Sequence, residues 1–384
     1  MFQDSGPVLS GDLLKKLHSR AADYDRENAF FAEDVADLRE AGYLRAAIPA
    51  DRGGLGLSLA ELNREQRRLG YWAPATGVGI NMHLYWTGPT ADFARAGDAG
   101  VDWLVEEIVA GKVFAAGHGE PGNDIGLFDS LTAAVPVAGG YRVSGHKVFT
   151  SLSPAWDWLG IHARDDSDPE HPKVVHGFVA RDSEGVRTEP TWDTLGLRAT
   201  ASHDTYMDNV FVPHERVVGI FDVGAMPDGF VFAILPWVLP MLGNVYLGLG
   251  RRAVDLALDT AQRRTTKSTG DAPVASKPFI QYLAAEAELV LEGATAQLDE
   301  LTAGLTAGVD YGERILYRVF AAKENATRAA RQATELAMEI VGAGSLHRRG
   351  ELERLYRDVR AGAFHPPNSE AVHDFIGRSV LGMM

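Results

Sequence analysis

Apolar residues follow three different patterns along the 384-residue chain, and each pattern predicts a separate region. From residue 10 to about residue 112, apolar side chains recur at near-helical spacing, as at Phe31, Val35, Leu38 and Leu44. A glycine-rich stretch at residues 51–56 interrupts this pattern as a turn. We therefore expect an α-helical N-terminal domain over residues 1–112.

The pattern changes after residue 112. Short β-rich runs at 141–143, 174–179 and 210–212 are separated by clusters of Gly, Asp and Pro. Runs of this length with turn residues between them are typical of a small sheet or barrel. We therefore expect a middle β-domain over residues 113–222.

Long stripes of apolar residues at helical spacing return after residue 222. The three stripes consist of Leu242, Val245, Leu249, Ala253 and Leu256; of Leu289, Leu291, Ala294, Leu298 and Leu301; and of Leu316, Val319, Ala322 and Ala326. Helices with such stripes pack as a bundle, so residues 223–384 predict a C-terminal helical bundle. The apolar run 230–249 contains Pro236, Pro240 and Asn244 and is interpreted as a buried core helix rather than a membrane span. The predicted fold class is mainly α with a central β-domain.

Composition narrows the possible functions. A net charge of −15 argues against a nucleic-acid partner, because phosphate binding needs clustered Lys and Arg. The absence of cysteine excludes disulfides, thiolate zinc sites, iron–sulfur clusters and a Cys nucleophile. No His-Glu-x-x-His segment is present, so we expect no catalytic metal. Residues 1–16 do not resemble a signal peptide, and we expect a soluble cytoplasmic enzyme that does not enter a membrane.

Four segments, in order, resemble motifs of the acyl-CoA dehydrogenase superfamily. The segments are Gly119-Glu120-Pro121-Gly122-Asn123-Asp124; Gly145-His146-Lys147 with the following Thr150-Ser151; Leu195-Gly196-Leu197-Arg198 with the strand end Val210-Phe211-Val212-Pro213; and Ile340-Val341-Gly342-Ala343-Gly344 with Glu353-Arg354-Leu355-Tyr356-Arg357-Asp358. The first is shorter than the family motif by two residues. The resemblance covers nearly the whole chain. It implies the acyl-CoA dehydrogenase fold, with an N-terminal helical domain, a middle β-domain and a C-terminal four-helix bundle.

The resemblance also implies a flavin cofactor, expected to be FAD, with FMN as the alternative. By counting from Lys147, Trp158 matches the aromatic residue that lies against the flavin ring, which is flat and needs a stacking surface. Ser151 matches a hydroxyl donor at the flavin edge, and Asn123 falls where the family motif has Ser. The alternative interpretation is structural, with Trp158 a core residue and Ser151 a strand-end residue.

In this family the bundle binds the nucleotide half of FAD, partly across a subunit interface. Arg263 and Thr265 match an Arg-x-Thr motif suited to a pyrophosphate, although the alternative is a solvated helix end. Gly342 and Gly344 permit close backbone approach to a cofactor. The chain departs from the family at Thr266–Gly270, which replaces a Phe-Gly pair, and at Glu339, where relatives have Gln. A homotetramer or homodimer is expected.

The usual catalytic carboxylate is missing from both places that the family uses. Counting from Arg357 places Pro366 at one position, and counting back from Gly248 places Val238 at the other. Three residues could substitute, and they are His365, Glu370 and His83. His365 lies beside the vacant position, and Glu370 follows at the start of the next predicted helix. His83 lies on a helix that faces the substrate in this family. Glu370 has a structural alternative as a first-turn residue, and His83 as a packed core histidine.

Three functions are compatible with these residues. The first is an oxidoreductase that desaturates an acyl thioester, either acyl-CoA or carrier-bound, with an atypical base and with electron-transfer flavoprotein as partner. The second is a two-component monooxygenase that receives flavin from a flavin reductase and hydroxylates an aromatic or sulfur-containing substrate with O2. Some such enzymes carry a His-x-Pro segment, which His365-Pro366-Pro367 resembles. The third is a non-catalytic binding relative. The motifs favour the first narrowly, while the missing carboxylate favours the second.

Overall fold

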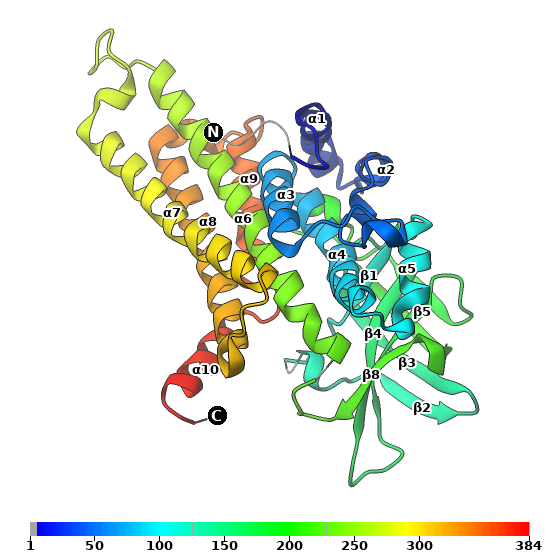
Figure 1. Cartoon of the computed structure of the whole chain (residues 1–384). Coiled ribbons are helices and arrows are strands. Elements are labelled where there is room, and N and C mark those ends of the chain that lie inside the picture. Colours follow the sequence, from blue (N-terminus) through cyan, green and yellow to red (C-terminus); the bar gives the residue numbers. More distant parts are fainter. Residues whose placement is uncertain (1–5, 125, 228, 384) are drawn as a thin grey trace.

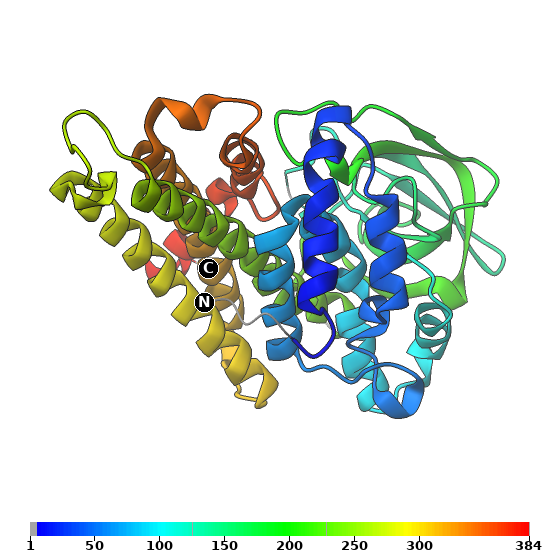
Figure 2. The same cartoon turned by 90° about the horizontal axis from the view of Figure 1, so that it is seen from above.

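The computed structural model describes residues 6–124, 126–227 and 229–383. Helices come first along the chain and pack beside the end of the bundle that faces the sheet (Figures 1 and 2). They are α1 (Gly11–Glu27), α2 (Ala32–Glu40), α3 (Leu59–Trp72), α4 (Pro74–Arg95) and α5 (Asp102–Val109). Side chains set where some of them begin. Ser10 accepts a hydrogen bond from the Leu13 N–H at the start of α1, and Ser58 and Glu61 form a capping box at the start of α3.

A mixed sheet follows. Its strands are β1 (Phe114–Gly117), β2 (Ala133–Val137), β3 (Gly140–Thr150), β4 (Trp158–Asp165), β5 (Lys173–Ala180), β6 (Val186–Glu189), β7 (His203–Pro213) and β8 (Val217–Asp222). The strand order is β6-β7-β3-β2-β4-β5-β8, and β1 pairs in parallel with β4. Strand β3 pairs with β7 in antiparallel fashion, but its register shifts between Lys147 and Thr150. Such a bulge re-aims the side chains beside it, and the candidate site begins there.

The C-terminal part is a bundle of long helices. Its helices are α6 (Gly229–Arg263), α7 (Pro278–Thr306) and α8 (Ile315–Val341), followed by the shorter α9 (Glu351–Val359) and α10 (Ser369–Val380). Figure 1 shows α6, α7 and α8 side by side, with α10 at the end of the chain. This arrangement of helices, sheet and bundle confirms the predicted fold class.

Helix α6 joins the bundle to the N-terminal helices. A Cβ atom at Gly70 would lie 2.2 Å from the Val245 carbonyl oxygen, and one at Gly248 would lie 2.1 Å from the Arg67 carbonyl oxygen. Glycine at both positions therefore permits α3 and α6 to pack backbone against backbone.

Helix α6 is long and apolar enough to cross a membrane, with a mean hydropathy of 1.8 over its most apolar window. However, 83% of that window is buried inside the protein. This burial is that of a core helix and confirms the interpretation of residues 230–249.

Candidate functional site

The end of β3 presents an aromatic ring and a hydroxyl beside the bulge. Phe149 has a left-handed backbone with φ of 58° and a side chain that is 67% exposed, which is unusual for a phenylalanine. Its ring lies 6.1 Å from that of Trp192, centroid to centroid. Two residues later, Ser151 is nearly buried, and its backbone N–H donates to the Phe149 carbonyl oxygen. The bulge therefore turns Phe149 outward while Ser151 remains anchored.

Three hydroxyls form a chain behind Ser151. The Oγ atoms of Ser151 and Ser202 lie 2.7 Å apart, and Ser202 Oγ lies 2.7 Å from Thr200 Oγ1. Thr200 Oγ1 donates in turn to the Leu197 carbonyl oxygen at 2.9 Å. Because Thr200 donates its one hydrogen to Leu197, Ser202 donates to Thr200 and Ser151 donates to Ser202, so the chain presents Ser151 to a ligand as an acceptor.

A buried ion pair supports the loop that precedes β2. Lys147 Nζ donates to Glu120 Oε1 at 2.6 Å, and both side chains are at most 1% exposed. Glu120 also accepts from the backbone N–H groups of Leu131 and Thr132 and from the hydroxyls of Ser130 and Thr132. The sequence analysis missed this role, although a Glu and a Lys within two family motifs were a signal for it.

Burial and charge shift the pKa values of Glu120 and Lys147 in opposite directions. Burial alone would raise the pKa of Glu120, but the Lys147 charge and the hydrogen bonds outweigh it and lower that pKa to about 2. Burial lowers the pKa of Lys147 to about 8, although Glu120 opposes the shift. Both groups are therefore charged at pH 7.

His365 lies in the loop between α9 and α10 and contacts a buried tyrosine. The hydroxyl oxygen of Tyr246, on α6, lies 2.6 Å from His365 Nε2. Lys323, on α8, is fully buried and donates to the carbonyl oxygens of His365 and Pro367, at 2.9 Å each. Burial, with a smaller effect of the Lys323 charge, lowers the pKa of His365 to about 3, so this side chain is neutral. Tyr246 and Lys323 gave no signal in the sequence beyond a polar residue within an apolar stripe.

The two vacant base positions carry no acid in the structure. Pro366 follows His365 in the loop, and Val238 is a core residue with 4% exposure. Glu370 is exposed in the first turn of α10, where it lines an open groove of about 510 Å³ with Phe364, Arg328 and other residues. The structure therefore places His365 against the bundle core and Glu370 on the surface.

His83, predicted as a possible catalytic base, lies in the protein core. Its ring is fully buried, with Nδ1 accepting from the Phe114 N–H at 3.1 Å and Nε2 donating to the Leu44 carbonyl oxygen at 2.7 Å. Burial also lowers its pKa to about 4. Both ring nitrogens are satisfied by backbone, which leaves His83 as a packed core histidine.

Trp158, predicted to lie against the flavin ring, contacts other side chains of the protein. Its Nε1–H donates to Glu107 Oε2 at 2.8 Å, and the Arg216 guanidinium lies 5.2 Å from its ring centroid. Its ring also meets that of Trp103 edge-on, at 5.4 Å between centroids. Helix α5 and the turn before β8 thus occupy the surroundings of Trp158, and Phe149 is an exposed aromatic near Ser151.

The remaining predicted residues fall into two places. Asn123 donates its amide hydrogens to Glu120 Oε2 and to the Asp129 carbonyl oxygen, which makes it part of the loop before β2. Arg263 is 74% exposed at the end of α6 and pairs with Asp259 on its own helix. The following Arg264 donates to the Val341 carbonyl oxygen at 2.5 Å.

The hydrogen bond from Arg264 to the Val341 carbonyl oxygen brings the end of α6, with Arg263 and Thr265, beside Gly342 and Gly344. Gly342 has a φ of 73°, and a Cβ atom at either glycine would meet nothing within 4 Å. The role of these four residues in nucleotide binding stays a prediction.

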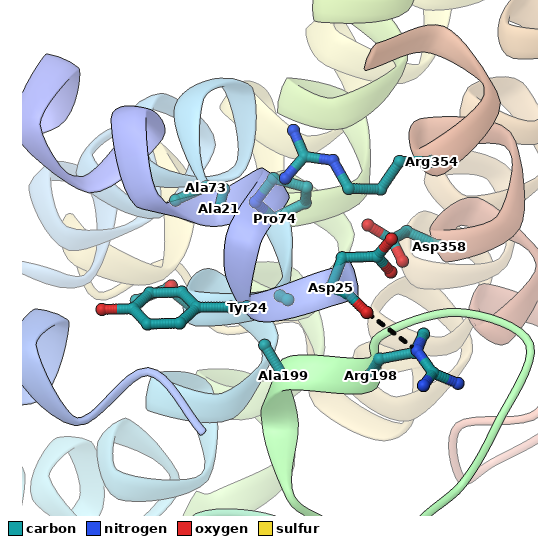
Figure 3. A pocket seen from close by; sticks show the side chains of 11 residues that line it. Ala21, Tyr24, Asp25, Ala73, Pro74, Arg198, Ala199, Arg354 and Asp358 are labelled. Atoms are coloured by element: carbon teal, nitrogen blue, oxygen red, sulfur yellow. Dashed lines mark hydrogen bonds between the residues drawn. The ribbon is translucent and has the colours of Figure 1, made fainter. Parts of the chain in front are cut away.

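A small recess connects two of the family motifs (Figure 3). The Leu197 N–H donates to Asp358 Oδ1 at 2.6 Å, and Arg198 Nε donates to the Asp25 carbonyl oxygen at 2.9 Å. Figure 3 shows Asp25 and Asp358 close together on the side of the recess where Arg198 and Arg354 lie. Leu197 also packs in the same core cluster as Tyr246. The 195–202 loop therefore carries two of the three hydroxyls, those of Thr200 and Ser202, and packs through Leu197 into the cluster that contains Tyr246.

Comparisons with known proteins agree with this architecture. The acyl-CoA dehydrogenase middle domain matches residues 115–210, and the acyl-CoA dehydrogenase C-terminal domain matches residues 241–370. YdbM of Bacillus subtilis (strain 168), provisionally named an acyl-CoA dehydrogenase, is 31% identical over 94% of this chain and 93% of its own length. L-evernosamine nitrososynthase of a Micromonospora species is 26% identical over 98% of this chain and 89% of its own. The structure of KijD3 with FMN and a dTDP-linked amino sugar has a TM-score of 0.85 at 26% identity, over 97% of this chain and 92% of that one.

Proposed function

The chain belongs to the acyl-CoA dehydrogenase family, and from this premise we propose that it is a flavin-dependent monooxygenase supplied with reduced flavin by a separate reductase. One observation carries this proposal. His365 is a neutral histidine. It directly precedes Pro366, which stands where the family has its usual catalytic carboxylate. Desaturation of a thioester needs a base that removes the α-proton. A donor that stabilises negative charge on oxygen is instead what an oxygenase needs.

The residues at the end of β3 fit a flavin. The ring of a flavin needs an apolar surface, and Phe149 projects one from the sheet. The polar edge of a reduced flavin carries N–H donors, and Ser151, whose own O–H donates into the hydroxyl chain, would accept from one of them. A bound reduced flavin supplies two electrons to O2, so that one oxygen atom enters the substrate and the other leaves as water. Both FAD and FMN are compatible with these contacts, and KijD3 was crystallised with FMN.

A comparison of two flavin reactions tests the proposal. We expect the purified protein to bind reduced FMN or FAD, and to slow the return of oxidised-flavin absorbance after O2 is added, relative to free reduced flavin. Given indole as an aromatic probe or dibenzothiophene as a sulfur probe, 18O2 should label any product with a single oxygen atom. Butyryl-CoA, added without O2, should leave oxidised flavin coloured. Bleaching by butyryl-CoA together with formation of the unsaturated thioester would overturn the proposal.

His365→Ala is expected to accelerate that return of absorbance, because reduced flavin loses a donor beside the reacting oxygen. The loss of stabilisation by one such donor is typically worth on the order of 10²-fold, so we expect the return of absorbance to be faster by up to about 10²-fold. The measurement is stopped-flow absorbance after mixing the reduced complex with O2. The matched control is His373→Ala, because His373 is an exposed histidine on α10 that lines the neighbouring groove. Equal traces for the two variants would contradict a role for His365.

Acyl-thioester desaturation remains the second candidate, and the 31% identity to YdbM favours it. In that case Glu370 is the carboxylate nearest in sequence to the vacant position, although it is exposed. Electron-transfer flavoprotein would then be the electron partner. The butyryl-CoA titration separates the two candidates directly.

We also propose that the chain acts as a homodimer or homotetramer in the cytoplasm. Helix α7 carries Phe279, Tyr282 and Leu289 with exposed side chains, and Leu289 is 67% exposed. Apolar side chains exposed along one helix are typical of an interface.

Leu289→Glu is expected to weaken self-association about tenfold or more, because it places a charge where the interface excludes water. Light scattering during size-exclusion chromatography measures the change. Leu131→Glu is the control, because Leu131 is equally exposed but lies in the β-domain. An unchanged mass for Leu289→Glu would exclude this surface of α7 as the interface.

A further inference from the structure

The hydroxyl of Tyr246 is a buried polar group with a single partner. Tyr246 lies on α6 in the bundle core, is 0% exposed, and packs with Leu242, Val245 and Leu249. Among the described residues, its hydroxyl bonds only to His365 Nε2, at 2.6 Å. The two residues are 119 positions apart in the sequence, so this contact is made only by the fold.

The direction of this hydrogen bond follows from satisfying the buried hydroxyl. Burial raises the pKa of Tyr246 well above its ordinary value, so the hydroxyl keeps its proton. A buried O–H that fails to donate costs about 1–3 kcal/mol. Because His365 Nε2 is the one acceptor in contact, the hydroxyl donates to it, and Nε2 therefore carries no hydrogen. His365 is neutral, so its single hydrogen is on Nδ1.

The backbone of the loop that carries His365 is also fixed. Lys323 Nζ donates to the carbonyl oxygens of His365 and Pro367, which holds the loop against α8. The Lys323 charge also disfavours a second proton on the ring. No described residue bonds to His365 Nδ1, so that N–H is available to another molecule.

We propose that Tyr246 is a positioning residue that fixes His365 in the Nδ1–H form, so that His365 offers a hydrogen-bond donor and not a base. This inference rests on the proposed function, because a donor is what oxygen chemistry needs at this place. It further implies that the substrate itself must bring a nucleophilic atom, such as an amine nitrogen or a sulfur, because His365 does not deprotonate it. Lys323 supports the arrangement from the opposite side.

The tautomer can be measured without any substrate or flavin. In protein labelled with ¹⁵N-histidine, long-range ¹H–¹⁵N spectra distinguish Nδ1–H from Nε2–H by the pattern of cross-peaks. The His365 signals are those that vanish in His365→Asn. We expect the Nδ1–H pattern for His365 in the unmodified protein. An Nε2–H pattern would overturn the inference whatever reaction the protein catalyses.

Tyr246→Phe tests the cause of the tautomer. Without the hydroxyl, Nε2 loses its donor, and we expect the His365 pattern to shift toward Nε2–H. Tyr43→Phe is the matched control, because Tyr43 is another fully buried tyrosine whose hydroxyl bonds to Gln66 elsewhere. Its spectrum should keep the Nδ1–H pattern at His365. If Tyr246→Phe leaves that pattern unchanged, Tyr246 does not set it.

Two amide replacements test whether the position of the donor at residue 365 matters for flavin reoxidation. The amide nitrogen of Asn can take the place of Nδ1, whereas that of Gln can take the place of Nε2. We expect His365→Asn to keep about tenfold more of the stopped-flow effect than His365→Gln. Equal losses would overturn the donor role. If instead the tautomer is Nδ1–H but His365→Ala has no effect on flavin reoxidation, the proposed function fails while the assignment of the tautomer stands.

Discussion

Replacing Lys147 by methionine is expected to destabilise the folded protein by about 3–5 kcal/mol, the usual cost of removing one partner of a buried ion pair. Glu120 is then left buried without a cation, so the folded state must either hold an unpaired charge or bind a proton there. The loss amounts to a large share of the total stability of a typical domain. Urea unfolding followed by circular dichroism measures it.

The control for this variant is Lys173→Met in the same β-domain. Lys173 pairs with Asp222, but its side chain is 42% exposed and that of Asp222 is 66% exposed. Exposed pairs contribute about 0–1 kcal/mol, so this variant should unfold near the urea concentration of the unmodified protein. If both variants lower the free energy of unfolding by the same amount, the buried Glu120–Lys147 pair contributes no more to stability than an exposed pair does.

The fold could be predicted because it follows from the period of the apolar residues. Stripes at helical spacing marked the bundle, and short β-rich runs between turn residues marked the sheet. In the apolar run 230–249, Pro236 and Pro240 argued against a membrane span, and the structure places that run in the core. These features depend on local sequence, so they could be predicted without knowledge of the contacts between distant residues.

The identity of the exposed aromatic residue near Ser151 could not be predicted from the local sequence. Counting along the chain pointed to Trp158, but a register shift between Lys147 and Thr150 turns Phe149 outward instead. A shift by one residue moves a side chain to the other face of a sheet, and no periodicity reveals it. The exposure of Phe149 is therefore a property of the sheet and not of its own segment.

The contacts of the histidines also depended on the fold. His365 was chosen for its place beside the vacant position, but its partner Tyr246 lies on another helix. His83 was a weaker candidate from the sequence, and two backbone groups bond to its two ring nitrogens. A histidine can be assigned as a ligand, an acid or a packed residue only when the partners of both ring nitrogens are known.

Lowering the pH from 6.5 to 4 is expected to unfold the protein, because five histidines are held neutral by burial in the native state. Burial lowers the pKa of His83 to about 4 and those of His176 and His365 to about 3, and it lowers the pKa values of His118 and His162 well below the ordinary value. The unfolded chain takes up protons below pH 6.5 that the native state does not bind. Stability is therefore complete above pH 6.5 and is lost as the pH falls below it.

Two buried carboxyls oppose this effect. Burial raises the pKa of Asp34 and of Asp358 to about 6, so below that pH the native state binds two protons that the unfolded chain binds only near pH 4. The net difference between pH 6 and 4 is then about three protons, or about 4 kcal/mol of unfolding free energy per pH unit. Since a domain has about 5–15 kcal/mol in total, urea midpoints should fall steeply across this range.

His176→Gln should reduce that slope by about 1.4 kcal/mol per pH unit, because it removes one of the five histidines. Glutamine can still donate to the Leu127 carbonyl oxygen, to which His176 Nε2 now bonds at 3.3 Å, so the loop keeps its contact. His171→Gln is the control, because His171 is exposed in the loop before β5 and should leave the slope unchanged. A stability that stays constant from pH 7 to 5 would show that the native protein takes up protons at these rings, and that the histidines are not held neutral by burial.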